Sequence, residues 1–147
     1  NEHGINSRID EIQSGILNLK LPKVKLWINQ RRKLAKFYSN ELKNTSLELP
    51  VENKNCRHVF HLYVVYHKKR NQILKKLKKN KINLNINYPF PIHKMKAYKN
   101  FVCVNCDCLP LTEKKADGIF SLPLYPSLKI SDASKITSLL KNILKEI

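Results

Sequence analysis

The sequence contains no apolar run that approaches the roughly 20 residues needed to cross a bilayer. The N-terminus also lacks the pattern of a secretory signal peptide. Both absences predict a soluble, cytoplasmic protein that has no membrane partner. Because the chain begins with Asn1 rather than Met, we expect it to be a piece of a longer polypeptide, and a targeting segment could precede it.

Acidic residues are scarce, because 11 Asp and Glu stand against 28 Lys and Arg, for a formal net charge of +17. Such an excess can indicate a nucleic-acid or phosphate partner. The lysines nevertheless occur in every segment, and no basic motif interleaved with aromatic residues is present. We therefore interpret the charge as a compositional bias and expect no nucleic-acid partner.

Cysteine is limited to four residues, three of which form a Cys-x2-Cys-x-Cys pattern: Cys103, Cys106 and Cys108. A zinc site would need a fourth ligand, such as His93 or one of His58 and His61. The second Cys-x2-Cys pair of many zinc sites is missing, and two histidines three residues apart on a strand point to opposite faces. We expect reduced thiols and no metal site.

The first third of the chain predicts a helical arm. Residues 7–21 have apolar side chains at the three- and four-residue spacing of an amphipathic helix, with Ser7 as the predicted N-cap. Pro22 is expected to interrupt this helix, and a second amphipathic helix follows over residues 23–43. Residues 1–45 should therefore form a long, bent arm that leads into the rest of the domain.

The middle of the chain predicts two strands that flank a short helix. Residues 57–67 are rich in β-branched and aromatic side chains, and residues 82–88 alternate apolar side chains with asparagines. Residues 71–79 read as a helix, with Asn80 as a left-handed C-cap residue. Pro89 and Pro91 should end the second strand.

Two more helices are predicted before the C-terminus. Thr112 is expected to cap a short helix that runs through Phe120, and Ser131 to cap the last helix. That last helix has the most regular apolar stripe: Ile136, Leu139, Leu140, Ile143, Leu144 and Ile147. The predicted fold class is α/β, as one small α+β-like domain over residues 1–147. Its small, mostly antiparallel sheet is covered by helices on one side.

Three stretches together resemble one family. Residues 4–13 read G-I-N-S-R-I-D-E-I-Q and resemble the G-x-N-x-R-x-D-E-x-Q segment of the DegT/StrS-type sugar aminotransferases. Residues 88–93, with Ala97 and Tyr98 after them, resemble that family's H-Y-P-x-P-x-H…A-Y segment. Residues 121–126 are similar to its S-L-P-x-x-P stretch. Since the order agrees, the chain resembles the C-terminal small domain of these fold-type I, pyridoxal-phosphate (PLP) dependent enzymes.

The resemblance implies a transaminase that moves an amino group from an amino acid, usually glutamate, to a keto group on a nucleotide-linked sugar. Such enzymes serve the biosynthesis of polysaccharides, glycans or antibiotic sugars. The resemblance also implies a homodimer with shared active sites. No segment here matches the family's cofactor-lysine motif, so no catalytic residue is assigned and the chain is not expected to transaminate alone.

The same resemblance assigns binding residues. Asn6 would reach the partner's PLP phosphate, and Arg8 would support a phosphate or a substrate carboxylate. Tyr88, His93 and Asn87 would lie near the nucleotide-sugar pocket. The family often has His where this chain has Asn87, which argues against proton transfer at that position.

Purely structural interpretations remain for three of these positions: a turn before the helix for Asn6, an exposed charge or interface ion pair for Arg8, and a surface imidazole for His93. Two other functions also remain possible, a regulatory member of the same family and a small basic binding module with a zinc-bound cysteine loop.

Overall fold

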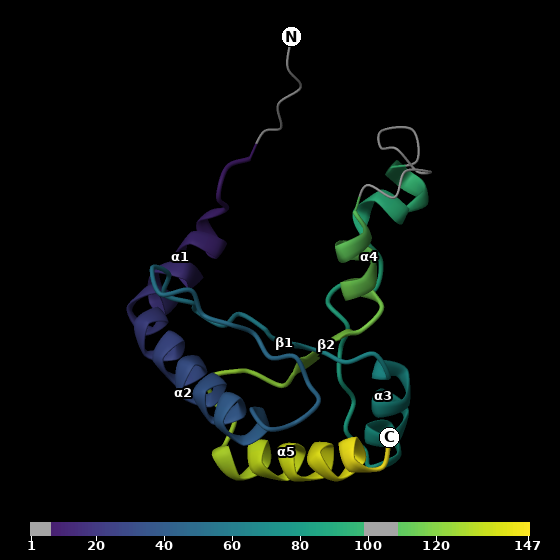
Figure 1. The fold of residues 1–147 in the computed structure, drawn as a ribbon. Helices are drawn as coiled ribbons and strands as arrows, with labels where there is room; N and C mark the ends of the chain where they lie inside the picture. Colours follow the sequence, from purple (N-terminus) through teal and green to yellow (C-terminus); the bar gives the residue numbers. More distant parts are fainter. Residues whose placement is uncertain (1–6, 99–108) are drawn as a thin grey trace.

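The computed structural model describes residues 7–98 and 109–147 (Figure 1). Its elements follow the chain in this order: α1 (Glu11–Lys20), the 3-10 turn η1 (Leu21–Lys23), α2 (Val24–Leu42), β1 (Tyr63–Tyr66), α3 (Arg70–Lys79), the 3-10 turns η2 (Ile92–Lys94) and η3 (Lys96–Tyr98), α4 (Pro110–Ala116), β2 (Ile119–Leu122) and α5 (Ile130–Lys145). The predicted mixed α/β class, with an N-terminal helical arm, an antiparallel sheet and a C-terminal helix, is confirmed.

The helical arm bends at the predicted proline. Pro22 lies in η1, where a missing backbone N–H is tolerated at the start of a turn, and α2 continues directly from it. The predicted cap at Ser7 is wrong. Asp10 is the N-cap, because its carboxylate accepts hydrogen bonds from the backbone nitrogens of Ile12, at 2.8 Å, and Gln13, at 3.3 Å.

The two strands of the sheet are shorter than predicted, and the second lies elsewhere in the chain. β1 and β2 pair antiparallel, with Tyr63 opposite Leu122 and Tyr66 opposite Ile119. The predicted strand at residues 82–88 contributes a single bridge, from Asn85 to Ser121, although its alternation of exposed Asn and half-buried Ile and Leu is present.

The start of the expected strand at residues 57–67 is irregular for a physical reason. Arginine side chains take the place of a neighbouring strand there. Arg31 Nη1 donates to the carbonyl of His61 at 2.9 Å and to that of Phe60 at 3.4 Å, and Arg32 Nη1 donates to that of His58 at 2.6 Å. Because these carbonyls are satisfied by guanidinium groups, the backbone forms no ladder before Tyr63.

Four other predicted helix ends are displaced. Asn80 has φ −93°, and the left-handed residue is Lys81, with φ 62°. Thr112 and Ser131 lie inside α4 and α5, whose N-caps Leu109 and Lys129 make no side-chain cap bond. The helix predicted to run to Phe120 stops at Ala116, and Phe120 belongs to β2.

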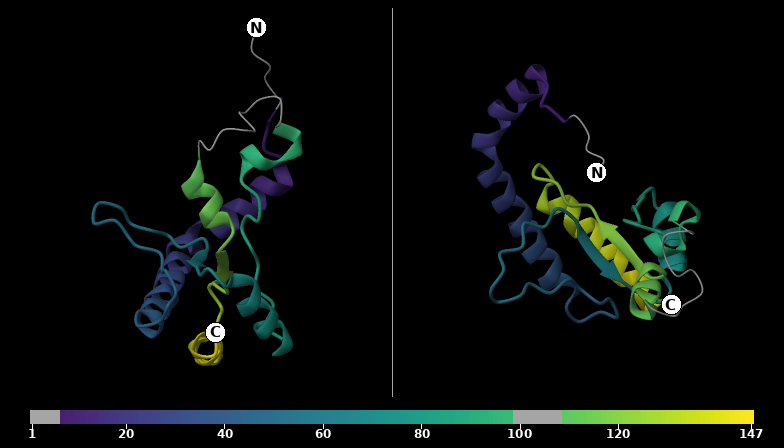
Figure 2. Two further views of the ribbon diagram at one scale, coloured as in Figure 1. Left: turned by 45° about the vertical axis from the view of Figure 1, so that its right-hand side comes forward. Right: turned by 90° about the horizontal axis from the view of Figure 1, so that it is seen from above.

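The core lies between the two-stranded sheet and three helices. Figure 2 (left) looks along α5, with α2 on one side of it and α3 on the other, and both helices contact α5. The most deeply buried side chains come from all of these elements: Tyr38, Leu42, Tyr63, Val65, Ile73, Leu77, Phe120 and Leu140. The apolar stripe of α5 therefore packs against the core, as its spacing predicts.

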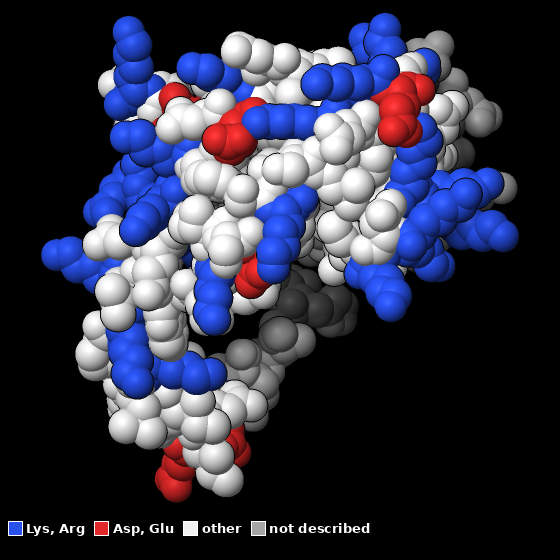
Figure 3. Space-filling model, turned by 90° about the horizontal axis from the view of Figure 1, so that it is seen from below, with Lys and Arg blue, Asp and Glu red and all other residues white. Residues whose placement is uncertain are grey.

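The surface of the domain has an apolar arm and a broad distribution of positive charge. Helix α1 has no buried residue, and its apolar side chains are open, with Ile12 75% and Leu19 77% exposed. Lys and Arg are distributed over the whole face drawn in Figure 3 rather than gathered in one groove. Within the described ranges, no helix is both long and apolar enough to cross a membrane.

Candidate functional site

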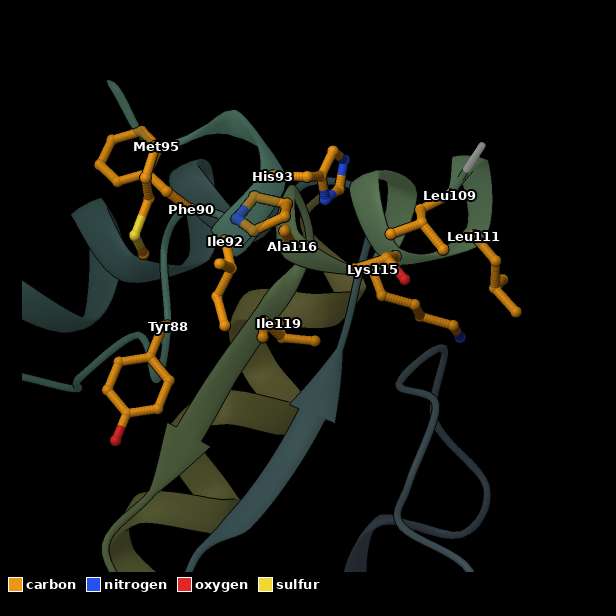
Figure 4. Close-up of a pocket in the computed structure, with 12 residues that line it drawn as sticks. Tyr88, Phe90, Ile92, His93, Met95, Leu109, Leu111, Lys115, Ala116 and Ile119 are labelled. Atoms are coloured by element: carbon orange, nitrogen blue, oxygen red, sulfur yellow. The ribbon is translucent and has the colours of Figure 1, made fainter. Parts of the chain in front are cut away.

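An open pocket of about 760 Å³ lies between the segment at residues 88–95 and helix α4 (Figure 4). Most of its walls are apolar side chains: Tyr88, Phe90, Pro91, Ile92, Met95, Leu109, Leu111, Ala116 and Ile119. Its polar side chains are few: His93, Thr112 and Lys115. An apolar cavity with a few polar groups is the usual form of a small-molecule site.

The wall at residues 88–93 is tied to strand β2. Ser121 N donates to Asn85 O at 2.9 Å, and Ser121 Oγ donates to Asn87 Oδ1 at 3.1 Å. These two bonds fix the segment just before Tyr88. Pro89 and Pro91 then restrict the backbone, so Tyr88 and His93 are presented from a stiff support.

The opposite wall, α4, is held at its C-terminal end. Arg70 Nη1 on α3 donates to the carbonyls of Ala116 and Ile119. Gly118 then lets the chain pass against Tyr66, since a Cβ at this position would lie 2.3 Å from Tyr66 Cε2. A side chain there would force the aromatic ring or the turn to move.

His93 is buried in the pocket wall and bonded to a carboxylate of the other wall. Its Nε2 lies 2.9 Å from Glu113 Oε1, and Lys94 Nζ lies 3.1 Å from the same oxygen. The hydrogen bond with His93, and then the one with Lys94, hold the pKa of Glu113 below its ordinary value. Glu113 is therefore ionised and joins the two walls.

Lys115 is the other cation at the pocket, and it is engaged elsewhere. Its ammonium is ion-paired with Glu48 and lies 4.5 Å from the centre of the Tyr66 ring. Both contacts are to residues that do not line the pocket. The pocket therefore offers little positive charge to a ligand.

The structure brings together three of the sequence-predicted residues. Tyr88, which is 73% exposed, and His93 line the pocket, and Asn87 lies beside them, half-buried against Ser121. Arg8 is exposed just before α1, on the arm and outside this pocket. Asn6 lies outside the described residues.

No part of the described chain gathers three His, Cys, Asp or Glu side chains in an arrangement that could hold a metal ion. Cys103, Cys106 and Cys108 lie outside the described residues. His58 Nδ1 accepts the backbone N–H of Phe60 at 2.8 Å, so that nitrogen serves the local turn.

Glu113 and Arg70 belong to the site, and sequence reasoning did not single them out. The separation of 20 residues between His93 and Glu113 has no local signature. One signal was available, since the chain has no Asp or Glu between Glu52 and Asp107, so a buried basic group in that stretch must find its carboxylate elsewhere.

The chain is similar in sequence to proteins of one known family. The chain matches the DegT/DnrJ/EryC1/StrS aminotransferase family over residues 1–141. It is 43% identical, over 130 residues, to the dTDP-3-amino-3,4,6-trideoxy-alpha-D-glucose transaminase of Micromonospora megalomicea. The aligned region covers 85% of this chain and 34% of that protein.

Two solved structures share the fold. The crystal structure of DesV from S. venezuelae, in complex with a ketimine intermediate, matches with a TM-score of 0.92 and 28% identity, over 99% of this chain and 39% of that one. NtdA from Bacillus subtilis, with bound cofactor PMP, matches with a TM-score of 0.84 and 25% identity, over 99% of this chain and 34% of that one.

The chain thus spans about a third of the length of these relatives. The match runs through all three stretches that carry the resemblance in the sequence, at residues 4–13, 88–93 and 121–126. The chain belongs to the DegT/DnrJ/EryC1/StrS aminotransferase family.

Proposed function

We propose that these residues form the small-domain part of a PLP-dependent transaminase. The enzyme would move an amino group from an amino acid, usually glutamate, to a keto group on a nucleotide-linked sugar, in the biosynthesis of a polysaccharide, glycan or antibiotic sugar in the cytoplasm. One observation carries the proposal: in a chain of this family, the Tyr88–His93 segment forms a wall of an open pocket.

In this proposal the described residues bind and orient the nucleotide sugar. Tyr88 is exposed at the pocket and can lie against a sugar or base, and His93 provides a hydrogen-bonding atom from a buried, fixed ring. Asn87 already bonds Ser121 through Oδ1, so its amide N–H groups are the atoms that would serve a ligand.

The cofactor does not fit the described pocket as its main site. A phosphate needs several donors, whereas the pocket has few: the hydroxyl groups of Tyr88 and Thr112, and the side chains of His93 and Lys115, which already bond Glu113 and Glu48. We therefore assign most cofactor contacts, and the lysine that bears PLP, to other parts of the enzyme. PLP when bound supplies the electron sink of transamination.

The helical arm supports a shared active site in a homodimer. Arg8 lies just before helix α1, and the helix shows apolar side chains along its length that nothing in the described chain covers. A ten-residue helix with no buried face is marginal by itself and needs a surface to pack on. We propose that a two-fold mate supplies this surface, so that Asn6 and Arg8 reach the mate's PLP phosphate.

Complementation between two inactive subunits tests the proposal in the full-length enzyme. One variant is Asn6→Ala, and the other lacks the PLP-bearing lysine. With random pairing of equal amounts, half the dimers are mixed and each has one intact site, so about a quarter of the wild-type activity should return. Asn142→Ala, an exposed position on α5, is the matched control and should stay fully active with normal PLP retention.

Two outcomes would contradict parts of this proposal. If the enzyme does not aminate any nucleotide-linked keto sugar, the assigned reaction is wrong. If it does, but Asn6→Ala retains PLP normally, Asn6 does not contact the phosphate and the cross-subunit role fails.

A further inference from the structure

The pairing of His93 with Glu113 restricts how the pocket can meet its substrate. His93 is the only buried imidazole among the histidines in the described ranges, and it is 6% exposed. Its partner, Glu113, comes from a different element, α4, and the distance from Nε2 to Oε1 is 2.9 Å. A buried ring with one nitrogen engaged can contact a ligand only through the other nitrogen.

The direction of the hydrogen bond follows from the charge of Glu113. Its pKa is lowered by the bond to His93 and then by Lys94, so the carboxylate is ionised and can only accept. The hydrogen must therefore lie on Nε2. Lys94 Nζ lies 3.1 Å from the same oxygen, so the carboxylate is held by two partners.

We propose that Glu113 is the positioning residue for His93: it accepts a hydrogen bond from Nε2 and so fixes the ring with Nδ1 toward the substrate. This inference rests on the proposed function. A ring nitrogen can bond a sugar hydroxyl whether it donates or accepts, because a hydroxyl group does both. We assign His93 to a hydroxyl group of the sugar.

Kinetics of the full-length enzyme distinguish positioning from simple structural support. We expect Glu113→Ala and His93→Ala each to raise KM for the nucleotide sugar by roughly tenfold, the value of one good hydrogen bond, and to leave KM for the amino donor unchanged. Because Glu113 acts through His93, the double variant should be no worse than His93→Ala alone. Glu113→Gln should fall between wild type and Glu113→Ala, since its amide oxygen can still accept from Nε2.

The matched control is Glu52→Ala. Glu52 is also an ion-paired carboxylate with a lowered pKa, held chiefly by its hydrogen bond to Arg32, but it lies outside this pocket. Its removal should leave both KM values unchanged. Substrate analogues that each lack one sugar hydroxyl provide a second readout. The analogue that lacks the hydroxyl bonded to Nδ1 should bind wild type and His93→Ala equally well.

Several results would overturn the inference. Additive effects of Glu113→Ala and His93→Ala, or equal rises in KM for both substrates, would show that Glu113 only supports the fold. A wild-type enzyme that aminates nucleotide sugars while both variants keep a normal KM would refute this inference alone. An enzyme without such activity would refute the proposed function instead.

Discussion

The hydroxyl group of Tyr38 offers the most direct test of how the site is supported. Tyr38, on α2, is fully buried, and its hydroxyl donates to the carbonyl of Pro123 at 2.9 Å. Pro123 follows β2 immediately, in the S-L-P-L-Y-P stretch. The bond therefore joins the helical arm to the chain just after β2, the strand that holds the pocket wall.

Replacement of Tyr38 by Phe should lower the free energy of unfolding by about 1–2 kcal/mol. A net hydrogen bond contributes on the order of 1 kcal/mol, and a carbonyl left without its donor adds to this cost when it is buried. Pro123 is only half-buried, which limits the second contribution. The ring itself is retained, so no cavity forms.

The measurement is urea denaturation of the 147-residue chain, read by circular dichroism. The midpoint should fall while the slope with denaturant is unchanged, because the variant exposes the same surface on unfolding. Tyr125→Phe is the matched control, since Tyr125 is 48% exposed, and its effect should be within about 0.5 kcal/mol. Equal effects of the two substitutions, or none for Tyr38→Phe, would refute this account of the Pro123 contact.

Two more predictions concern stability. Gly118→Ala should cost roughly 1–3 kcal/mol, because the new methyl group meets the Tyr66 ring at 2.3 Å, and Gly15→Ala, where nothing lies within 4 Å, should stabilise α1 or be neutral in the same urea assay. Acid should weaken the fold below the ordinary Glu pKa of 4.5, because Glu52 and Glu113 have lowered pKa values in the folded chain and their contribution, present above that value, is lost as pH falls through the folded pKa. Thermal melts from about pH 7 to about pH 3 should be less pH-dependent in Glu52→Gln/Glu113→Gln, and an unchanged profile would contradict the role of these carboxylates.

Apolar spacing in the sequence was enough to predict most of the helices. The stripe from Ile136 to Ile147 predicts α5 and its buried face, and Pro22 predicts the bend in the arm, because both signals are local and depend only on the geometry of one helix. The alternation at residues 82–88 likewise predicted which side chains turn inward. The strand predicted there is wrong beyond one bridge at Asn85, since pairing depends on a partner that the sequence does not identify.

The family was also accessible from the sequence, through three short stretches in the right order. Tyr88 and His93 line one pocket, and their contact with a nucleotide sugar stays a prediction. Only the tertiary structure decided the rest. The bonds from Arg31 and Arg32 to carbonyls of residues 58–61 replaced a predicted strand, and Gly118 with Arg70 ended a predicted helix. The partnership of His93 with Glu113 joins residues 20 apart. Contacts of this kind depend on where whole elements pack, and local periodicity carries no information about that.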